Sequence, residues 1–136
     1  MEINDLYSIA ENKGHDIVSL RLTESPAFSI EDNVGRCHIA MSNDLSSLNK
    51  KVLLAHELGH CEYGGFYNYH SKFELRSRCE NRADRWSYLK LVPFTELKEL
   101  TQQGHELWEI ADHFDVPVEF LHSAIKFYTE TLGRRL

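Results

Sequence analysis

The chain has 136 residues, of which 42% are hydrophobic and 26% charged, and its formal net charge is −6. This length fits one domain that can bury a core without disulfide cross-links. The ordinary composition excludes a largely disordered chain. The negative charge disfavours nucleic-acid binding that depends on neutralising phosphates.

The three cysteines are Cys37, Cys61 and Cys79, an odd number without CxxC spacing. This pattern argues against a secreted disulfide framework, so we expect reduced thiols. The start of the chain lacks the basic and then apolar order of a signal peptide. No apolar run approaches the roughly 20 residues that cross a bilayer. We therefore expect a cytoplasmic protein without a membrane partner.

The first third of the chain predicts one helix and two strands. Apolar residues from Ile3 to Ala10 have helical spacing, which favours a helix over residues 2–13 that stops before Gly14. Alternating patterns over residues 16–22 and 36–42 predict two strands, separated by a turn around Pro26. We expect these two strands to pair.

The remainder of the chain is predicted to be helical. Apolar residues from Leu45 to Leu58 follow Ser and Asn caps in helical register, so a helix extends to about His60. A loop over residues 64–71 precedes a second helix, which begins near Glu74 and is stopped by Pro93. Three further helices are predicted over about 95–103, 105–114 and 117–131.

The segment "HELGH" in the first long helix has the H-E-x-x-H arrangement. His56 and His60 are four residues apart, so both lie on one helix face and can hold one ion together. Glu57 is rotated by about 100 degrees from His56. Its carboxylate can therefore act as a general base without being a metal ligand. The alternative is a helix with two unrelated histidines, because this motif also arises by chance.

The third ligand is expected from the following helix. A metzincin would continue with Gly and His where this chain has Tyr63 and Phe66, so that class is excluded. A gluzincin takes a glutamate instead, and Glu80 lies 20 residues after His60. Asp84, one helical turn further, can accept the free ring N–H of His56 or His60. The alternative is that both carboxylates are solvated parts of a charge run flanked by arginines.

These features predict an α+β, zincin-like (gluzincin) fold in a single domain. The domain is mostly helical, with a small N-terminal β-sheet. We expect residues 1–93 to form the zincin-like core and residues 94–136 a helical C-terminal extension packed on it.

Several side chains near the motif are weaker candidates. Tyr63, Tyr67 and His70 belong to the region that should border the cleft, where a phenol or imidazole can stabilise an oxyanion or contact substrate. His38 is a further candidate for this role, although it has no partner at metal spacing. More often such side chains only line a wall. Cys61 and Cys79 each adjoin a proposed ligand, but a one-residue step turns them away from the ligand face.

The chain resembles the ImmA/IrrE family of zinc metallopeptidases, especially the compact versions encoded by phages and mobile elements of Gram-positive bacteria. The resemblance rests on "LLAHELGH", "CENRADRWSYLKLVP" and "LWEIADHFDVPVEFL", in that order. It implies one zinc ion per chain, with His56, His60 and Glu80 as ligands and Glu57 as catalytic base. It also implies site-specific cleavage of a helix-turn-helix repressor, which relieves repression.

The expected reaction is peptide-bond hydrolysis, in which Glu57 takes a proton from a water activated by zinc. An extended substrate can pair with an exposed strand edge. Residues 37–43, "CHIAMSN", are predicted to supply that edge because they precede the motif helix.

Two other classes of function remain open. "IADHFDVPVEFLHSAI" has the order of a helix-turn-helix DNA reader, but residues 95–136 carry eight acidic and four basic side chains, which suits phosphate poorly. The second class is an antirepressor or toxin-like interaction module that keeps zinc as structure. Glu57 separates this class from a peptidase, since a structural site needs no base. No direct nucleic-acid partner is expected, and the sequence does not predict the oligomeric state.

Overall fold

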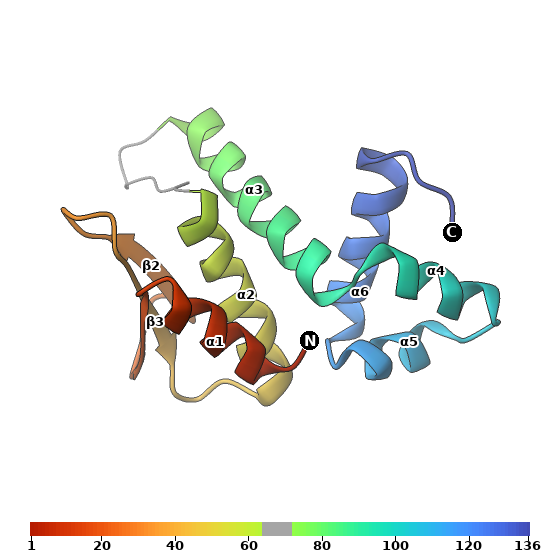
Figure 1. The fold of residues 1–136 in the computed structure, drawn as a ribbon, viewed down its shortest axis with the longest axis horizontal. Coiled ribbons are helices and arrows are strands. Elements are labelled where there is room, and N and C mark those ends of the chain that lie inside the picture. The colour runs from red at the N-terminus through yellow and green to blue at the C-terminus, as the bar shows by residue number, and fades with distance from the viewer. Residues whose placement is uncertain (64–71) are drawn as a thin grey trace.

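The computed structural model describes residues 1–63 and 72–136 of an α+β protein. Its described elements, in chain order, are α1 (Ile3–Asn12), β1 (Asp16–Leu20), β2 (Ala27–Glu31), β3 (Cys37–Ser42), α2 (Ser47–Tyr63), α3 (Phe73–Leu91), α4 (Phe94–Gln102), α5 (Leu107–Phe114), α6 (Val118–Lys126) and a π-helical turn, η1 (Phe127–Thr131). The predicted helices and the small N-terminal sheet are confirmed (Figure 1). None of the described helices is long and apolar enough to cross a membrane.

The sheet has three strands in the order β1-β3-β2, one more strand than the sequence predicts. The two predicted strands, β1 and β3, pair as expected, and the structure shows that they do so in parallel. Strand β2 pairs with β3 in antiparallel orientation. The region predicted as a turn around Pro26 therefore leads directly into a strand. Because β2 has only five residues and follows a proline, its alternation was too short to separate from a turn.

One face of the sheet packs against α1 and α2 (Figure 1). Ile39 and Met41 on the central strand are at most 1% exposed on this face. Side chains alternate between the two faces of a strand. Val18 and Phe28 accordingly lie on the opposite face, where they remain nearly half exposed.

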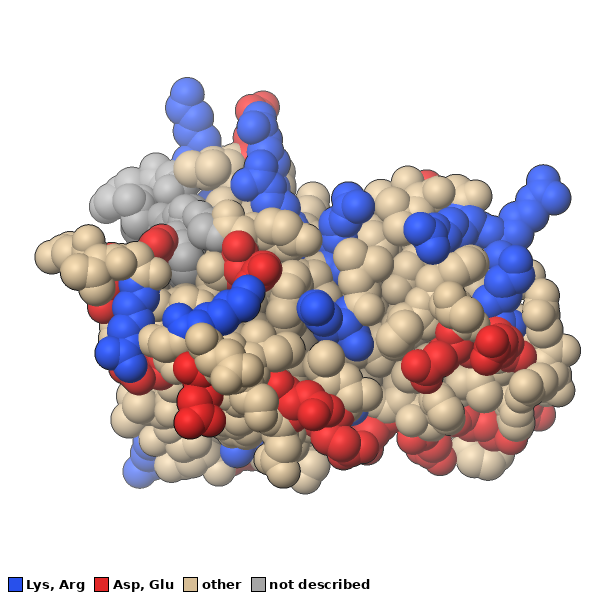
Figure 2. Space-filling model, viewed as in Figure 1, with Lys and Arg blue, Asp and Glu red and all other residues tan. Residues whose placement is uncertain are grey.

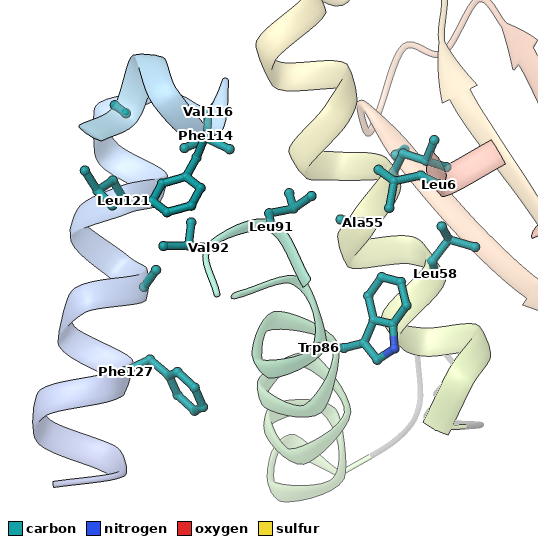
Figure 3. Packing of buried hydrophobic residues seen from close by; sticks show 14 of the residues in the cluster. Leu6, Ala55, Leu58, Trp86, Leu91, Val92, Phe114, Val116, Leu121 and Phe127 are labelled. Atoms are coloured by element: carbon teal, nitrogen blue, oxygen red, sulfur yellow. The ribbon is translucent and has the colours of Figure 1, made fainter. Parts of the chain in front are cut away.

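The hydrophobic core continues from the sheet to the C-terminal helices. Leu91 and Val92, at the end of α3, lie between Leu58 on one side and Phe114 and Leu121 on the other (Figure 3). Each of these residues is less than 5% exposed. One cluster of buried residues thus joins the two parts, although the division into a core and an extension at residue 93 remains a prediction.

A buried lysine ties α2 to the C-terminal helices. Lys51 is 2% exposed, and its Nζ donates a hydrogen bond to the carbonyl oxygen of Phe114 at 2.8 Å. Phe114 ends α5, and the last carbonyls of a helix lack partners within the helix. Lys51 therefore caps α5 from a neighbouring helix, and burial lowers the pKa of its ammonium group despite the nearby Asp115 carboxylate.

The expectation of three reduced thiols is wrong for two of the cysteines. Cys37, at the start of β3, and Cys61, in the last turn of α2, form a disulfide with their Cα atoms 5.8 Å apart. Cys79 is free and buried. The pairing was not predictable, because the two cysteines are 24 residues apart and approach only when α2 packs on the sheet.

Helices α2 and α3 approach closely at Gly59. A Cβ atom built on Gly59 would lie 2.7 Å from both the Cα and the carbonyl oxygen of Ala83. Backbone atoms cannot yield as a flexible side-chain end can, so glycine is required for this distance between the helices.

Gly59→Ala should destabilise the protein by about 1 to 3 kcal/mol, the range typical of overpacking. In an exposed helix the same change normally stabilises, by roughly 0.5 to 1 kcal/mol. Urea denaturation with a chelator present, so that metal does not contribute, measures the difference. Equal or higher stability of the variant would contradict the close approach of α2 and α3.

Candidate metal centre

Helix α2 places two imidazoles on the same face. His56 and His60 are one turn apart, and their ring centroids are separated by 4.9 Å. The helix begins after Ser46, whose hydroxyl accepts the backbone N–H of Asn49, and its inner side is buried through Leu54, Ala55 and Leu58. This packing holds His60 at 6% exposure.

Helix α3 brings Glu80 between the two histidines. The Oε2 atom of Glu80 lies 2.7 Å from Nε2 of His56, and its Oε1 atom lies 3.1 Å from Nε2 of His60. One ligand atom from each of the three residues lies within 4.8 Å of the others. The predicted donor set is therefore assembled in space, from two helices that the contact at Gly59 holds together.

Asp84 contacts the outer nitrogen of His56. Its Oδ1 atom lies 2.8 Å from Nδ1 of His56, on the opposite side of the ring from Glu80. The sequence allowed either His56 or His60 as the partner of Asp84, and in the structure the partner is His56. A carboxylate in this position fixes the tautomer and orientation of the ring.

The two carboxylates control the charge of His56. Burial lowers the pKa of the imidazole, but hydrogen bonds and charge interactions with Asp84 and Glu80 outweigh burial and raise the pKa to about 10. Without a metal, His56 is therefore a cation between two anions at neutral pH. A metal cation would replace this proton as the positive charge at the centre.

A cleft of about 450 Å³ opens beside the three donors. Residues 25–29, which include the start of β2, form one wall, and Leu53 and Glu57 from α2 lie along the other with His56 and His60. Glu57 is 7% exposed and lines the cleft without belonging to the three-donor group. The arrangement places a carboxylate, an ion-binding group and a strand next to one another.

The strand beside the cleft is not the predicted one. Residues 37–43 were expected to offer an edge, but β3 is the central strand and pairs on both sides. Among the described residues, β2 has a neighbour on one side only, and it is the strand that lines the cleft. The sequence prediction failed because β2 itself was not recognised. Its signal was the weak alternation of Ala27 and Ser29 with Phe28 and Ile30.

The two weaker candidates within the described residues, His38 and Tyr63, do not join the three donors. His38 points to the sheet face away from α2, and its ring lies 3.1 Å from Asp16 and 2.9 Å from Asp32. Tyr63, at the end of α2, is 45% exposed and is not a lining residue of the cleft. Tyr67 and His70 lie outside the described residues.

The donor set fits zinc. Two imidazole nitrogens and one carboxylate oxygen are a known ligand combination of catalytic zinc, which leaves one coordination position for water or substrate. The second nitrogen of His56 already has the carboxylate partner that metal-binding histidines usually have.

Zinc affinity should depend on pH well above the range of an ordinary histidine. Binding must displace the proton of His56, whose pKa is about 10. Apparent affinity should therefore rise by about tenfold per pH unit between roughly pH 7 and pH 9. Competition with a chromophoric chelator at several pH values measures this slope.

Asp84→Asn provides the matched control, because it keeps a hydrogen-bond acceptor and removes one negative charge. This substitution should lower the pKa of His56. Zinc affinity should therefore stop rising at a lower pH than in the wild type. A wild-type affinity that is already constant above about pH 7.5, as expected for the ordinary histidine pKa of 6.5, would contradict the charge assignment.

Comparison with known proteins identifies the family. The family model described as IrrE N-terminal-like domain, Peptidase_M78, matches residues 10–126. A search of curated proteins gives no significant match. The matched region spans both helices of the candidate metal centre and the sheet beside it, and it confirms the resemblance noted from the sequence. The chain belongs to the IrrE N-terminal-like family of peptidases and has a metallopeptidase-type function.

Proposed function

We propose that the protein is a zinc-dependent endopeptidase that cleaves a helix-turn-helix repressor of a phage or mobile element and thereby relieves repression. The observation that carries the catalytic part is the position of Glu57, which lines the cleft beside the three metal donors without being one of them. A structural metal site needs no such carboxylate. The repressor is the substrate class that resemblance to the ImmA/IrrE family implies.

The metal would be held by His56, His60 and Glu80. When bound there, zinc would supply Lewis acidity toward water and the substrate carbonyl. Asp84 keeps Nε2 of His56 directed at the centre by accepting a hydrogen bond from Nδ1. Glu80 is contributed by a different helix, so the donor set depends on the packing of α3 against α2.

Glu57 acts as the general base. It accepts a proton from the attacking water and returns one to the leaving amine, so that no net proton is consumed at the carboxylate. At 7% exposure Glu57 lies in the cleft wall and not in bulk solvent. Since it is one residue from His56 along α2, its carboxylate is held next to the metal donors by the same helix.

The substrate would bind as an extended segment along β2. The open side of this strand faces no other strand among the described residues, and residues 25–29 line the cleft. Addition of a strand to a sheet edge supplies main-chain hydrogen bonds regardless of sequence. Pro26, Ala27 and Leu53 give the cleft apolar contacts that would select among side chains.

Binding of DNA by the C-terminal helices is disfavoured by their charge. Acidic groups are prominent over α4 and α5 along the lower margin of the molecule (Figure 2). Ile110, Phe114 and Leu121 give this segment the pattern of a helix-turn-helix. All three are buried in the common core, so packing accounts for the pattern equally well. A protein partner therefore fits the molecule better than a nucleic acid does.

Coexpression with the repressor encoded beside the gene tests the proposed substrate. Intact-mass analysis should find two repressor fragments whose masses add up to the intact repressor plus one water. An intact repressor in a stable complex with the protein would instead support an antirepressor that acts by binding.

Glu80→Ala should reduce zinc affinity by more than about 100-fold, because it removes a direct ligand. Asp84→Ala should cost about 10 to 100-fold in affinity or activity, the range for partners that act through a ligand. Equilibrium competition with a chelator distinguishes these effects. Glu74→Ala is the matched control, since Glu74 is an exposed carboxylate of the same helix. Unchanged zinc affinity in Glu80→Ala would show that the ligand assignment is wrong.

Glu57→Gln should keep the fold and the zinc content while the cleavage rate falls by roughly 10² to 10⁴-fold, the contribution of general acid–base catalysis. The amide retains size and hydrogen bonding but cannot take the proton. Thermal unfolding and metal analysis of the same preparation serve as controls. Full relief of repression in cells by this variant would reject proteolysis as the mechanism and favour the antirepressor.

A further inference from the structure

The disulfide between Cys37 and Cys61 lies next to the candidate metal centre. Cys61 directly follows the donor His60 in the last turn of α2, and Cys37 is the first residue of the central strand. The disulfide therefore connects the sheet to the end of the helix that carries two of the three donors.

Beyond His60, the last turn of α2 approaches solvent: Cys61 is partly buried, and Glu62 and Tyr63 are exposed. Glu62 forms an ion pair with Lys13, but both side chains are at least one-third exposed, so the pair contributes little. Helix ends fray more readily than helix interiors. The covalent link at Cys61 therefore restrains the end of α2 just beyond His60, in addition to the packing of α2 against α3.

The two sulfur atoms differ in their access to solvent. Cys37 is 1% exposed, and its backbone N–H donates to Nδ1 of His15 at 3.2 Å. Cys61 is only partly buried. An oxidant or a thiol would therefore react at Cys61 first. The third cysteine, Cys79, is buried at 3% exposure and free.

We propose that Cys37 and Cys61 form a reversible redox clip, which when oxidised holds the end of α2 on the sheet and increases retention of zinc at His60. This inference rests on the proposed zinc site. A domain of this size does not need a disulfide to fold. In reducing compartments, disulfides are usually transient and serve catalysis or redox sensing.

The oxidation is balanced with a peroxide as oxidant. The Cys61 thiolate attacks one peroxide oxygen, which forms a sulfenic acid and releases water after proton transfer. The Cys37 sulfur then attacks the Cys61 sulfur, the S–O bond breaks, and a second water leaves. Two thiols and one hydrogen peroxide thus give one disulfide and two waters. Thiol exchange with glutathione reverses the reaction through a mixed disulfide at Cys61.

The first experiment measures whether the disulfide forms reversibly in the 136-residue chain. The protein is equilibrated in buffers in which glutathione ranges from mostly oxidised to mostly reduced. Free thiols are then alkylated, and the mass of the protein is measured by mass spectrometry. The pair should change from oxidised to reduced within this series, whereas Cys79→Ala should not alter the transition. A pair that stays oxidised, or stays reduced, in every buffer overturns the proposal.

The second experiment measures the effect on the metal centre. Zinc release to a chromophoric chelator should be about tenfold faster after reduction with a phosphine, comparable to loss of an outer partner of a ligand. Cys61→Ser should release zinc at the reduced rate under both conditions, and Cys79→Ala should behave like the wild type. Equal release rates from oxidised and reduced wild type overturn the link to zinc.

Melting of the metal-free protein separates this proposal from the proposed function. Reduction should lower the melting temperature by about 10 °C, as expected for loss of a cross-link in a domain of this size. An unchanged melting temperature overturns the clip. If neither the oxidised nor the reduced protein binds zinc, the proposed function is wrong, and so is the effect of the clip on zinc retention. The change in melting temperature still decides whether the disulfide restrains the fold.

Discussion

The close approach of α2 and α3 at Gly59 is the constraint on which the candidate centre depends. Because Gly59 has no side chain, the backbone of Ala83 can approach α2 directly. Glu80 is one turn before Ala83 and Asp84 directly follows it, so both carboxylates are delivered to the histidine face of α2. A larger distance between the helices would separate Glu80 from the imidazoles and leave two histidines without a third donor.

The carboxylates around the centre favour a bound cation. His56 lies between Glu80 and Asp84, and its raised pKa reflects two negative charges that outweigh the cost of burial. The same charges would stabilise a divalent ion in place of the proton. In addition, Glu57 and the start of β2 line the same cleft as the three donors. A candidate base, an ion site and a strand that could pair with an extended chain are therefore adjacent.

The sequence predicted the helices and the donor set better than it predicted the sheet. His56, His60, Glu80 and Asp84 follow helical periodicity, so local spacing was enough to place them on facing sides of two helices. The strand β2 and the Cys37–Cys61 pair depend instead on long-range packing, which spacing does not encode. The error about the substrate edge followed directly, because β3 is a central strand only as a result of its pairing with β2.

X-ray absorption spectroscopy of the zinc-loaded protein tests the central claim most directly. Two imidazoles and one carboxylate predict a first shell of nitrogen and oxygen only, at about 2.0 to 2.2 Å, with the multiple-scattering signal of histidine. This shell should be the same in the oxidised and the reduced protein. A sulfur scatterer at about 2.3 Å would show that a cysteine has replaced one of the three donors, and would contradict the account.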